Sequence, residues 1–173
     1  MVNARSLLNS IVFLILVPSL SIAAPVISVP EDYPTIQEAI DAATPISTIR
    51  VMPGVHEESL TMREGIYVRG SGSDTTFLVA PSGHAVFADG IRDSLIGEFN
   101  ISAPELHPVM IQNGADVDIL NNTFEGTTSG IQFHGSMGRV SGNTFIDLDA
   151  EDPIAVSCMN GSSPSIIGNL FVR

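Results

Sequence analysis

The chain is poor in three residue types that shape most proteins: it has no lysine, no tryptophan and a single cysteine, Cys158. One cysteine excludes an intramolecular disulfide, so noncovalent packing must supply the stability of the fold. Cys158 alternates with the apolar Ile154 and Val156. This phase predicts a buried, small hydrophobic side chain rather than a reactive thiol.

Positive charge is also scarce, because seven Arg face 19 acidic residues and the formal net charge is −12. Nucleic acids and anionic membrane surfaces require a basic face, so both are excluded as expected partners. A polyanion such as pectate would bind only through bridging cations or a local cluster of Arg. The simplest interpretation of the charge is solubility outside the cell.

Long apolar runs are confined to the N-terminus. Arg5 is the only charged side chain before Pro25, Leu7 to Val17 form an apolar core, and Ser21-Ile22-Ala23 supplies small residues for cleavage. These features predict a signal peptide over residues 1–23, because the core is too short for a bilayer anchor. We therefore expect no membrane insertion, and a secreted, periplasmic or cell-surface protein over residues 24–173. Without Arg5, six Arg remain against 19 acids, a formal net charge of −13.

A short apolar segment recurs along the remaining chain at a nearly constant spacing. Its four copies begin at Val86, Val109, Ile131 and Ile154. A unit of this length cannot bury its own apolar face, so it must stack on copies of itself. The period predicts a solenoid with one such strand in each turn.

A second marker keeps the same phase: Asn122, Asn143 and Asn169 are each followed by Phe at the second position after them. The units are rich in Val, Ile, Gly, Asn and Thr, which disfavours leucine-rich repeats and favours a parallel β-helix. We expect the Asn side chains to lie at a repeated bend and to bond the turns above and below. Phe133 should point into the bore between Ile111 and Val156.

One amphipathic helix is predicted before the repeats. Thr35 and Glu38 form a capping box, an apolar face follows, and Pro45 ends the segment. We expect this helix to cover the open end of the first turn, as terminal units of solenoids do. No such cap is apparent before Arg173, so the last strand edges are expected to be open to end-to-end association. Truncation of a longer chain is the alternative.

Two segments together resemble the N-terminal cap and first turn of the pectin-lyase-like superfamily: Val29-Pro-Glu-Asp-Tyr-Pro-Thr-Ile-Gln-Glu-Ala-Ile-Asp-Ala-Ala43 and Ile49-Arg-Val-Met-Pro-Gly-Val-His-Glu-Glu58. The later Gly-Asn-x-Phe turns resemble the bacterial secreted right-handed β-helix repeat proteins of that superfamily. The resemblance implies an all-β fold, a right-handed parallel β-helix that is a single-stranded solenoid with an N-terminal capping α-helix.

The resemblance does not extend to the active sites of the enzymes in the superfamily. Gly54-x-x-Glu57 matches an early structural turn of pectinesterases, but no segment like their Asp-Phe-Ile-Phe-Gly follows. Phe133-His134-Gly135 is a fragment of the Gly-His-Gly of polygalacturonases, without their Asp pair. No acidic calcium cluster with an Arg base, as in pectate lyases, can be assembled.

The alternation of the repeated strand predicts two outward columns on one face. One contains Phe87, Met110, Gln132 and Ala155, and the other contains Asp89, Gln112, His134 and Ser157. An apolar column with an aromatic ring beside a polar one suits a sugar chain, which needs stacking and hydrogen bonds. The predicted binding residues are Phe87, Met110, Gln112, Gln132 and His134, and the alternative is an ordinary solvated face.

Catalysis has weaker candidates in Asp89, His134 and Arg63. Asp89 and His134 are two turns apart, about 9–10 Å, too far for a direct acid–base pair. Asp147, Asp149 and Asp152 are candidate calcium ligands in an acidic run, for which a solvated loop is the alternative. Asp118 and Arg139 are expected to form a surface ion pair.

These features favour a secreted β-helix repeat protein that binds carbohydrate or serves as a cell-surface module, without a complete active site. We expect no cofactor apart from calcium at the acidic run, and a polysaccharide or glycan as the partner. The alternative is a polysaccharide-degrading enzyme, a pectate lyase-like lyase or a pectinesterase-like esterase, whose remaining catalytic residues either lie beyond Arg173 in a longer chain or form a pattern that is not recognisable here. A third interpretation is a fragment of an adhesin-like solenoid.

Overall fold

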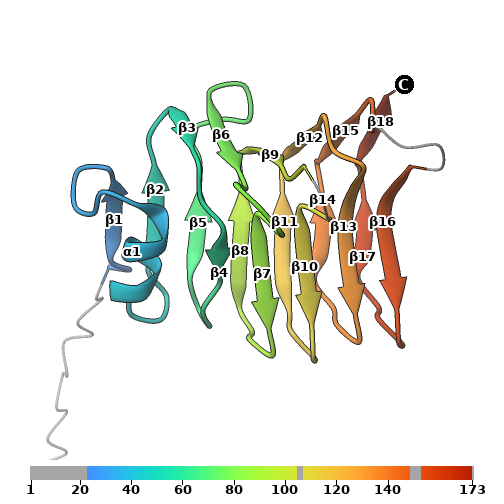
Figure 1. Ribbon diagram of the computed structural model, residues 1–173. Helices are drawn as coiled ribbons and strands as arrows, with labels where there is room; N and C mark the ends of the chain where they lie inside the picture. The colour runs from blue at the N-terminus through green and yellow to red at the C-terminus, as the bar shows by residue number, and fades with distance from the viewer. Residues whose placement is uncertain (1–22, 105–106, 149–152, 173) are drawn as a thin grey trace, which may run out of the picture.

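The computed structural model describes residues 23–104, 107–148 and 153–172, and it is a parallel β-solenoid closed at one end by a short helix (Figure 1). The chain winds through three sheets in turn, and all the pairings between named strands are parallel. The near-constant spacing of the apolar segments therefore predicts the architecture correctly. The predicted signal peptide lies outside the described residues, apart from Ala23. No helix in the described ranges is long and apolar enough to cross a membrane.

The three sheets have seven, six and five strands. The seven-stranded sheet consists of β1 (Val26–Val29), β2 (Thr48–Val51), β5 (Tyr67–Arg69), β8 (Ser94–Gly97), β11 (Val117–Leu120), β14 (Arg139–Ser141) and β17 (Ser165–Ile167). The six-stranded sheet consists of β3 (Gly54–His56), β6 (Thr76–Val79), β9 (Asn100–Ser102), β12 (Thr123–Glu125), β15 (Thr144–Ile146) and β18 (Leu170–Val172). The five-stranded sheet consists of β4 (Leu60–Thr61), β7 (Val86–Asp89), β10 (Val109–Gln112), β13 (Ser129–His134) and β16 (Ile154–Met159).

The core is a set of columns of like side chains along the bore. In the five-stranded sheet, Val86 pairs with Val109, and Val109 pairs with Ile131, all fully buried. Parallel in-register pairing places equivalent side chains about 4.8 Å apart, so each turn buries the apolar side chains of its neighbours. This stacking provides the stability that a chain with one cysteine cannot obtain from disulfides.

The register departs from the expectation at the last turn. Val156 pairs with Ile131, and Cys158 with Phe133, two positions later than the spacing of the earlier turns predicts. The connection before β16 is longer than the corresponding connections of the preceding turns, so the repeat lengthens here. Phe133 is inward and fully buried as predicted, but its neighbours are Ile111 and Cys158 rather than Ile111 and Val156.

Cys158 is exposed, so the prediction of a buried cysteine is wrong. Its position in the register is inward, since it pairs with the buried Phe133. No described residue forms a further turn over it, and an inward position is buried only when another turn covers it. Partial desolvation nevertheless raises the pKa of the Cys158 thiol.

The predicted ladder of asparagines is confirmed at the bend before the six-stranded sheet. Asn143 Oδ1 accepts hydrogen bonds from the Asn122 backbone N–H at 2.9 Å and from its side-chain amide at 3.2 Å. Asn169 repeats both contacts one turn later, at 2.9 and 3.0 Å. The left-handed backbone conformation was expected at the ladder asparagines themselves. It occurs instead at the residue before each of them, at Asn121, Gly142 and Gly168.

Helix α1 (Ile36–Ala42) covers the first turn, as predicted (Figure 1). Thr35 is its N-cap and accepts a hydrogen bond from the Glu38 backbone N–H at 3.2 Å. The buried face of Ile36, Ala39 and Ile40 packs onto the end of the solenoid. Glu58, from the turn beneath, accepts hydrogen bonds from the first two backbone N–H groups at 3.0 Å each, a favourable place for an anion.

Candidate functional site

The outer face of the five-stranded sheet carries two regular columns of side chains. Phe87 pairs with Met110, and Met110 pairs with Gln132. Beside them, Asp89 pairs with Gln112, and Gln112 with His134. The predicted columns are therefore present across β7, β10 and β13, and the five predicted binding residues lie on one face. All five are partly exposed, and Asp89 is exposed.

The fourth member of each column differs from the expectation. Ser157 rather than Ala155 follows Gln132, and Met159 rather than Ser157 follows His134. The cause is the shift in register by two positions at β16. The polar column therefore ends in an apolar side chain, Met159, which is 47% exposed. Gln132 Nε2 lies 3.3 Å from the Met159 sulfur.

Asp89 is held by amide side chains of the next turn. Its carboxylate accepts hydrogen bonds from Asn113 Nδ2 at 2.7 Å and from Gln112 Nε2 at 3.4 Å. His134 makes a separate contact, in which Asn160 Nδ2 donates to the imidazole Nε2 at 2.7 Å. An amide nitrogen can only donate, so Nε2 is the acceptor in this contact and Nδ1 carries the ring proton. Asp89 and His134 thus bond to different amides, and Gln112 lies between them in the column.

Arg63 lies apart from the polar column. Its guanidinium Nη1 donates to the backbone carbonyls of Ile40, at 3.1 Å, and of Asp41. These are carbonyls near the C-terminal end of α1, where a cation interacts favourably with the helix dipole. The side chain therefore anchors the capping helix to the first turn and does not extend the surface of Asp89, Gln112 and His134.

Two histidines that the sequence pattern did not single out border the apolar column. The ring of His84 stacks on that of Phe87, with centroids 6.4 Å apart and planes at 13°. His84 Nδ1 donates to the carbonyl of His107 at 2.6 Å. His84 and His107 are separated by one repeat, as Val86 and Val109 are, and this spacing is the signal that could have identified them. The ring of His84 widens the aromatic surface at the start of the face.

The surroundings of His107 disfavour the protonated form of its ring. Burial lowers the pKa of His107 below the ordinary value of 6.5, and the nearby His84 lowers it further. Its Nδ1 is buried without a hydrogen-bond partner among the described residues. A charged imidazolium here would be poorly solvated, so the folded protein favours the neutral ring.

We expect acid to destabilise the fold through His107. Because its folded pKa is depressed, the stabilisation is present above the unfolded value of 6.5 and is lost as pH falls through the folded pKa. Urea midpoints at about pH 8 and about pH 5 should therefore differ more in the wild type than in His107→Gln. An identical pH dependence in the two proteins would contradict the assignment. His56→Gln, at a partly exposed strand end, is the matched control.

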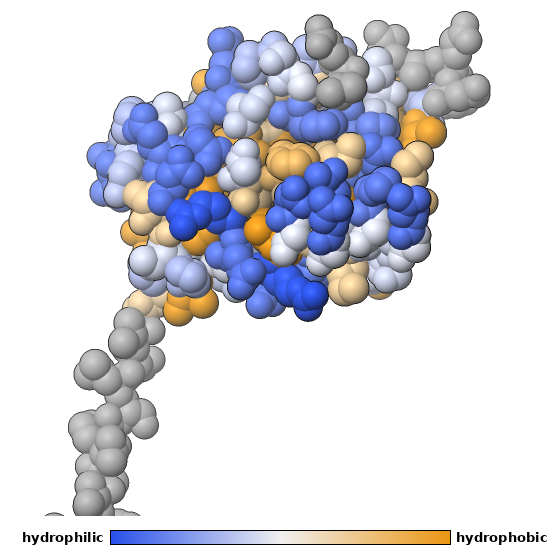
Figure 2. All heavy atoms as spheres, turned by 60° about the horizontal axis from the view of Figure 1, so that its bottom comes forward, coloured by the Kyte–Doolittle hydropathy of each residue, from blue (hydrophilic) through white to orange (hydrophobic). Residues whose placement is uncertain are grey.

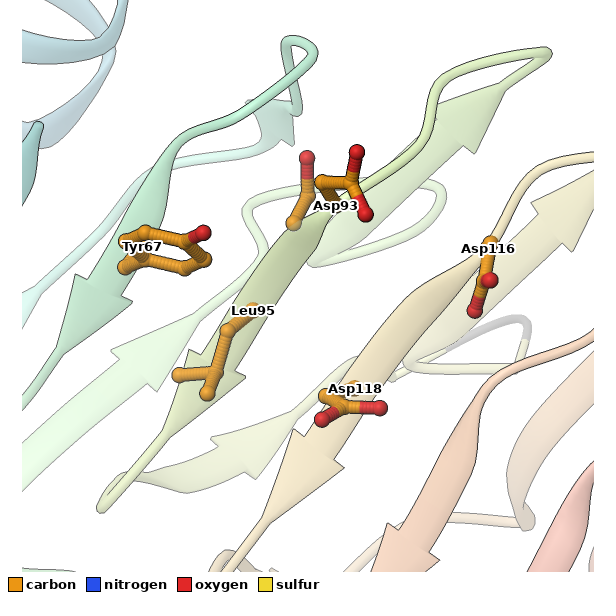
Figure 3. Close-up of a pocket in the computed structure, with 6 residues that line it drawn as sticks. Tyr67, Asp93, Leu95, Asp116 and Asp118 are labelled. Carbon is orange, nitrogen blue, oxygen red and sulfur yellow. The ribbon is translucent and has the colours of Figure 1, made fainter. Parts of the chain in front are cut away.

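A shallow depression of about 230 Å³ lies on a different face, over β5, β8 and β11 (Figure 3). Its lining includes Tyr67 and three acidic residues, Asp93, Asp116 and Asp118. Asp118 is already paired, because its Oδ2 contacts Arg139 Nη2 at 2.9 Å and its Oδ1 accepts from the Arg139 backbone N–H at 3.1 Å. The predicted surface ion pair is thereby confirmed. The sequence pattern indicated Asp118 but not its proximity to Asp93 and Asp116.

The predicted calcium ligands fall mostly outside the described residues. Asp149 and Asp152 lie outside the described residues. Asp147 is described and exposed, and its backbone N–H donates a hydrogen bond to the backbone carbonyl of Val172. Within residues 23–104, 107–148 and 153–172, no group of three or more His, Cys, Asp or Glu is arranged to hold a metal ion. Calcium at the acidic run remains an expectation from the sequence.

Comparison with protein families finds none that matches the chain, and comparison with curated proteins finds no match either. The fold and the geometry of the two columns are therefore the basis for the functional proposal.

Proposed function

We propose that this protein is a secreted carbohydrate-binding or cell-surface module that holds a neutral polysaccharide across β7, β10 and β13. The observation that supports this most is the pair of adjacent columns kept in register over three successive turns: one begins with the apolar Phe87 and Met110 and continues with Gln132, and the other is polar throughout. A sugar chain lying along the solenoid axis would meet one side chain of each column at every turn. The rise per turn, about 4.8 Å, is comparable to the length of one sugar unit.

The chemistry of the columns suits the two kinds of surface on a sugar. The rings of Phe87 and His84, stacked on each other, offer an apolar platform for the face of a sugar ring. Gln112, Gln132 and His134 offer amide and imidazole groups for hydroxyls. Asp89 adds a carboxylate acceptor beside them.

A neutral glycan is the proposed ligand because the protein is acidic. With a formal net charge of −12 for the whole chain, an anionic polysaccharide would be repelled at low ionic strength. Asp89 is the charged group within the columns themselves, and it is negative. The resemblance of the capping segment to the pectin-lyase-like superfamily, whose members act on polysaccharides, agrees with a carbohydrate ligand and with secretion.

Binding should depend on Phe87. We expect Phe87→Ala to weaken the affinity for a neutral glycan by about 3- to 10-fold, because the ring loses its stacking contact with the sugar. Isothermal titration calorimetry over a panel of neutral and acidic polysaccharides measures this effect. Gln132→Ala should weaken binding as well, with little change in melting temperature, since its side chain points outward.

Phe77→Ala is the matched control for Phe87→Ala. Phe77 is also a partly exposed, outward phenylalanine, but it lies on β6 in the six-stranded sheet. Its substitution should leave the affinity unchanged. Equal losses in both variants, or no binding across the panel, would sink the proposal and leave the face as ordinary surface. Release of sugar products that stops in Asp89→Asn or His134→Ala would instead favour a polysaccharide-degrading enzyme.

A further inference from the structure

Positive side chains are scarce in this protein, so the places where they come together are informative. Hydrophilic side chains cover much of the face in Figure 2, and with 19 acids against seven Arg most of the charged residues are negative. An anionic ligand can bind such a protein only where Arg residues lie close to each other. Arg50 in β2 and Arg69 in β5 meet this condition, on the outer face of the seven-stranded sheet.

Arg50 and Arg69 are paired in register on neighbouring strands. Ile49 and Val51, on either side of Arg50, are fully buried, and so is Val68 before Arg69. Both arginine side chains are therefore on the outward side of the sheet. Neighbouring strands are about 4.8 Å apart, and like charges placed directly opposite each other are destabilising. The pair is unfavourable for the folded protein until an anion lies near both groups.

Glu98 compensates one of the two positive charges. Its Oε1 accepts from Arg69 Nη1 at 3.0 Å, which leaves the other N–H donors of that guanidinium for a ligand. Arg50 has no ion-pair partner within residues 23–104, 107–148 and 153–172. Asp32, beside Ser28 in the same column, accepts from the Ser28 backbone N–H at 2.7 Å. The two guanidinium groups and Glu98 together leave one positive charge.

The backbone conformation at Glu98 is unfavourable for a glutamate. Its φ is 68°, in the left-handed region, and the equivalent positions of the next three turns are Asn121, Gly142 and Gly168, residue types that suit this conformation. The ion pair with Arg69 is between side chains that are 36% and 39% exposed, and such pairs contribute little to stability. A bulky residue with positive φ costs at least as much. Stability therefore does not explain Glu98, whereas orienting Arg69 toward a ligand does.

Hydroxyl groups add further donors on the same face. Ser28 precedes Arg50 in its column, and Thr48 lies two residues before Arg50 on the same outward side of β2. Tyr67 pairs with Thr48 and borders the acidic depression over β8 and β11 (Figure 3). The outer face of this sheet thus separates a positive, donor-rich area at β2 and β5 from an acidic area at β8 and β11. Guanidinium and hydroxyl donors together suit an oxyanion.

We propose that Arg50 and Arg69 form a binding site for the carboxylate group of a small organic acid. A guanidinium presents two parallel N–H donors that match the two oxygens of a carboxylate, so Arg50 contacts both oxygens while Arg69 donates from the neighbouring turn. The single positive charge that remains after pairing with Glu98 fits a monovalent carboxylate better than a divalent sulfate. The site lies on a different sheet from β7, β10 and β13, so it is independent of the proposed glycan face.

The test is an NMR titration of isotopically labelled protein in which sodium acetate replaces sodium chloride at a constant ionic strength of about 50 mM, where screening is weak. The side-chain Nε–H signals of Arg50 and Arg69 should shift together and saturate. Those of Arg63 and Arg139 should stay unchanged, because other groups of the protein already bind them. Arg50→Gln should weaken acetate binding by at least about 10-fold. Its side chain is exposed, so the variant should fold, as circular dichroism will show.

Arg92→Gln is the matched control. It removes the same charge from another exposed arginine, which lies before β8 and outside the pair, and the affinity for acetate should stay within about 2-fold of the wild type. Equal losses in Arg50→Gln and Arg92→Gln would reduce the effect to net charge and overturn the proposal. Signals that respond to chloride as they do to acetate would overturn it as well.

Glu98→Asn tests the charge balance of the site. It raises the charge of the site by one, so the affinity for sulfate relative to acetate should rise by at least about 10-fold. The melting temperature should stay within about 2 °C of the wild type, because asparagine suits the left-handed backbone and the exposed ion pair contributes little. An unchanged preference between the two anions, or a clearly lower melting temperature, would make Glu98 a structural residue and contradict the proposal.

Discussion

Phe133→Ala is expected to lower the free energy of unfolding by about 3–5 kcal/mol, as large-to-small changes in well-packed cores do. Phe133 is fully buried in β13 and stacks in the bore between Ile111 and Cys158. The neighbouring turns are fixed by their own backbone hydrogen bonds, so they cannot collapse into the space that the ring leaves. Urea unfolding of the wild type and the variant measures the difference.

Phe87→Ala is the control for this substitution. Phe87 lies one strand position before the inward Ala88 and points outward, partly exposed. The same change of side chain should therefore reduce the stability by less than about 1.5 kcal/mol, because little buried surface is lost. Similar losses in the two variants would mean that the assignment of inward and outward positions is wrong.

Asn143→Ala should have the second largest effect, a loss of about 2–5 kcal/mol in the free energy of unfolding. Asn143 is fully buried, and its side chain accepts from the Asn122 N–H and donates to the Ile119 carbonyl at 2.8 Å. Alanine would leave both of these backbone groups buried and unpaired, at about 1–3 kcal/mol for each group. The midpoint of urea unfolding should fall without a large change in slope.

Asn169→Ala provides a graded comparison within the same ladder. Asn169 is the last described member of the ladder and is only partly buried, so water can replace part of what its side chain provides. Its substitution should destabilise the protein clearly less than Asn143→Ala. If the two substitutions have equal effects, the ladder does not stabilise the fold through its buried hydrogen bonds.

The sequence predicts the fold and much of the candidate face because the repeat determines both. A nearly constant spacing aligns Val86, Val109 and Ile131, and the alternation along each strand then places Phe87, Met110 and Gln132 outward. The capping helix is equally predictable, since Thr35, Glu38 and an apolar face specify it locally. These features depend on short-range pattern, which one sequence contains in full.

The register of the last turn was not predictable from spacing. Ile154, Val156 and Cys158 alternate, so a shift of two positions keeps the same side chains inward and leaves the pattern unchanged. The length of the connection between β15 and β16 decides whether Ile154 or Val156 pairs with Ile131. The alternation of apolar residues gives no information about that length. The prediction for Cys158 failed for a related reason, because burial requires a covering turn that alternation does not reveal.

Contacts between turns that do not follow the spacing of the repeat are also beyond the sequence pattern. Glu58 caps the first N–H groups of α1, and Arg63 binds its last carbonyls, yet both residues come from the turn that follows the helix. The hydrogen bond from Asn160 to His134 also joins two turns. Because of it, the hydrogen-bond partner of the His134 ring is the Asn160 side-chain amide and not the Asp89 carboxylate. The chemistry of the candidate face therefore depends on tertiary contacts that only the structure provides.

The measurement that tests the central claim most directly is an NMR titration of isotopically labelled protein with a neutral glycan that binds in the calorimetric panel. If a sugar chain lies across the stacked turns, backbone amide signals of Phe87, Met110 and Gln132 should shift together and saturate at the same ligand concentration, while Phe77 on the other sheet stays unchanged. Signals that move only on one turn, or only around Tyr67 and Asp116, would contradict a binding face on β7, β10 and β13.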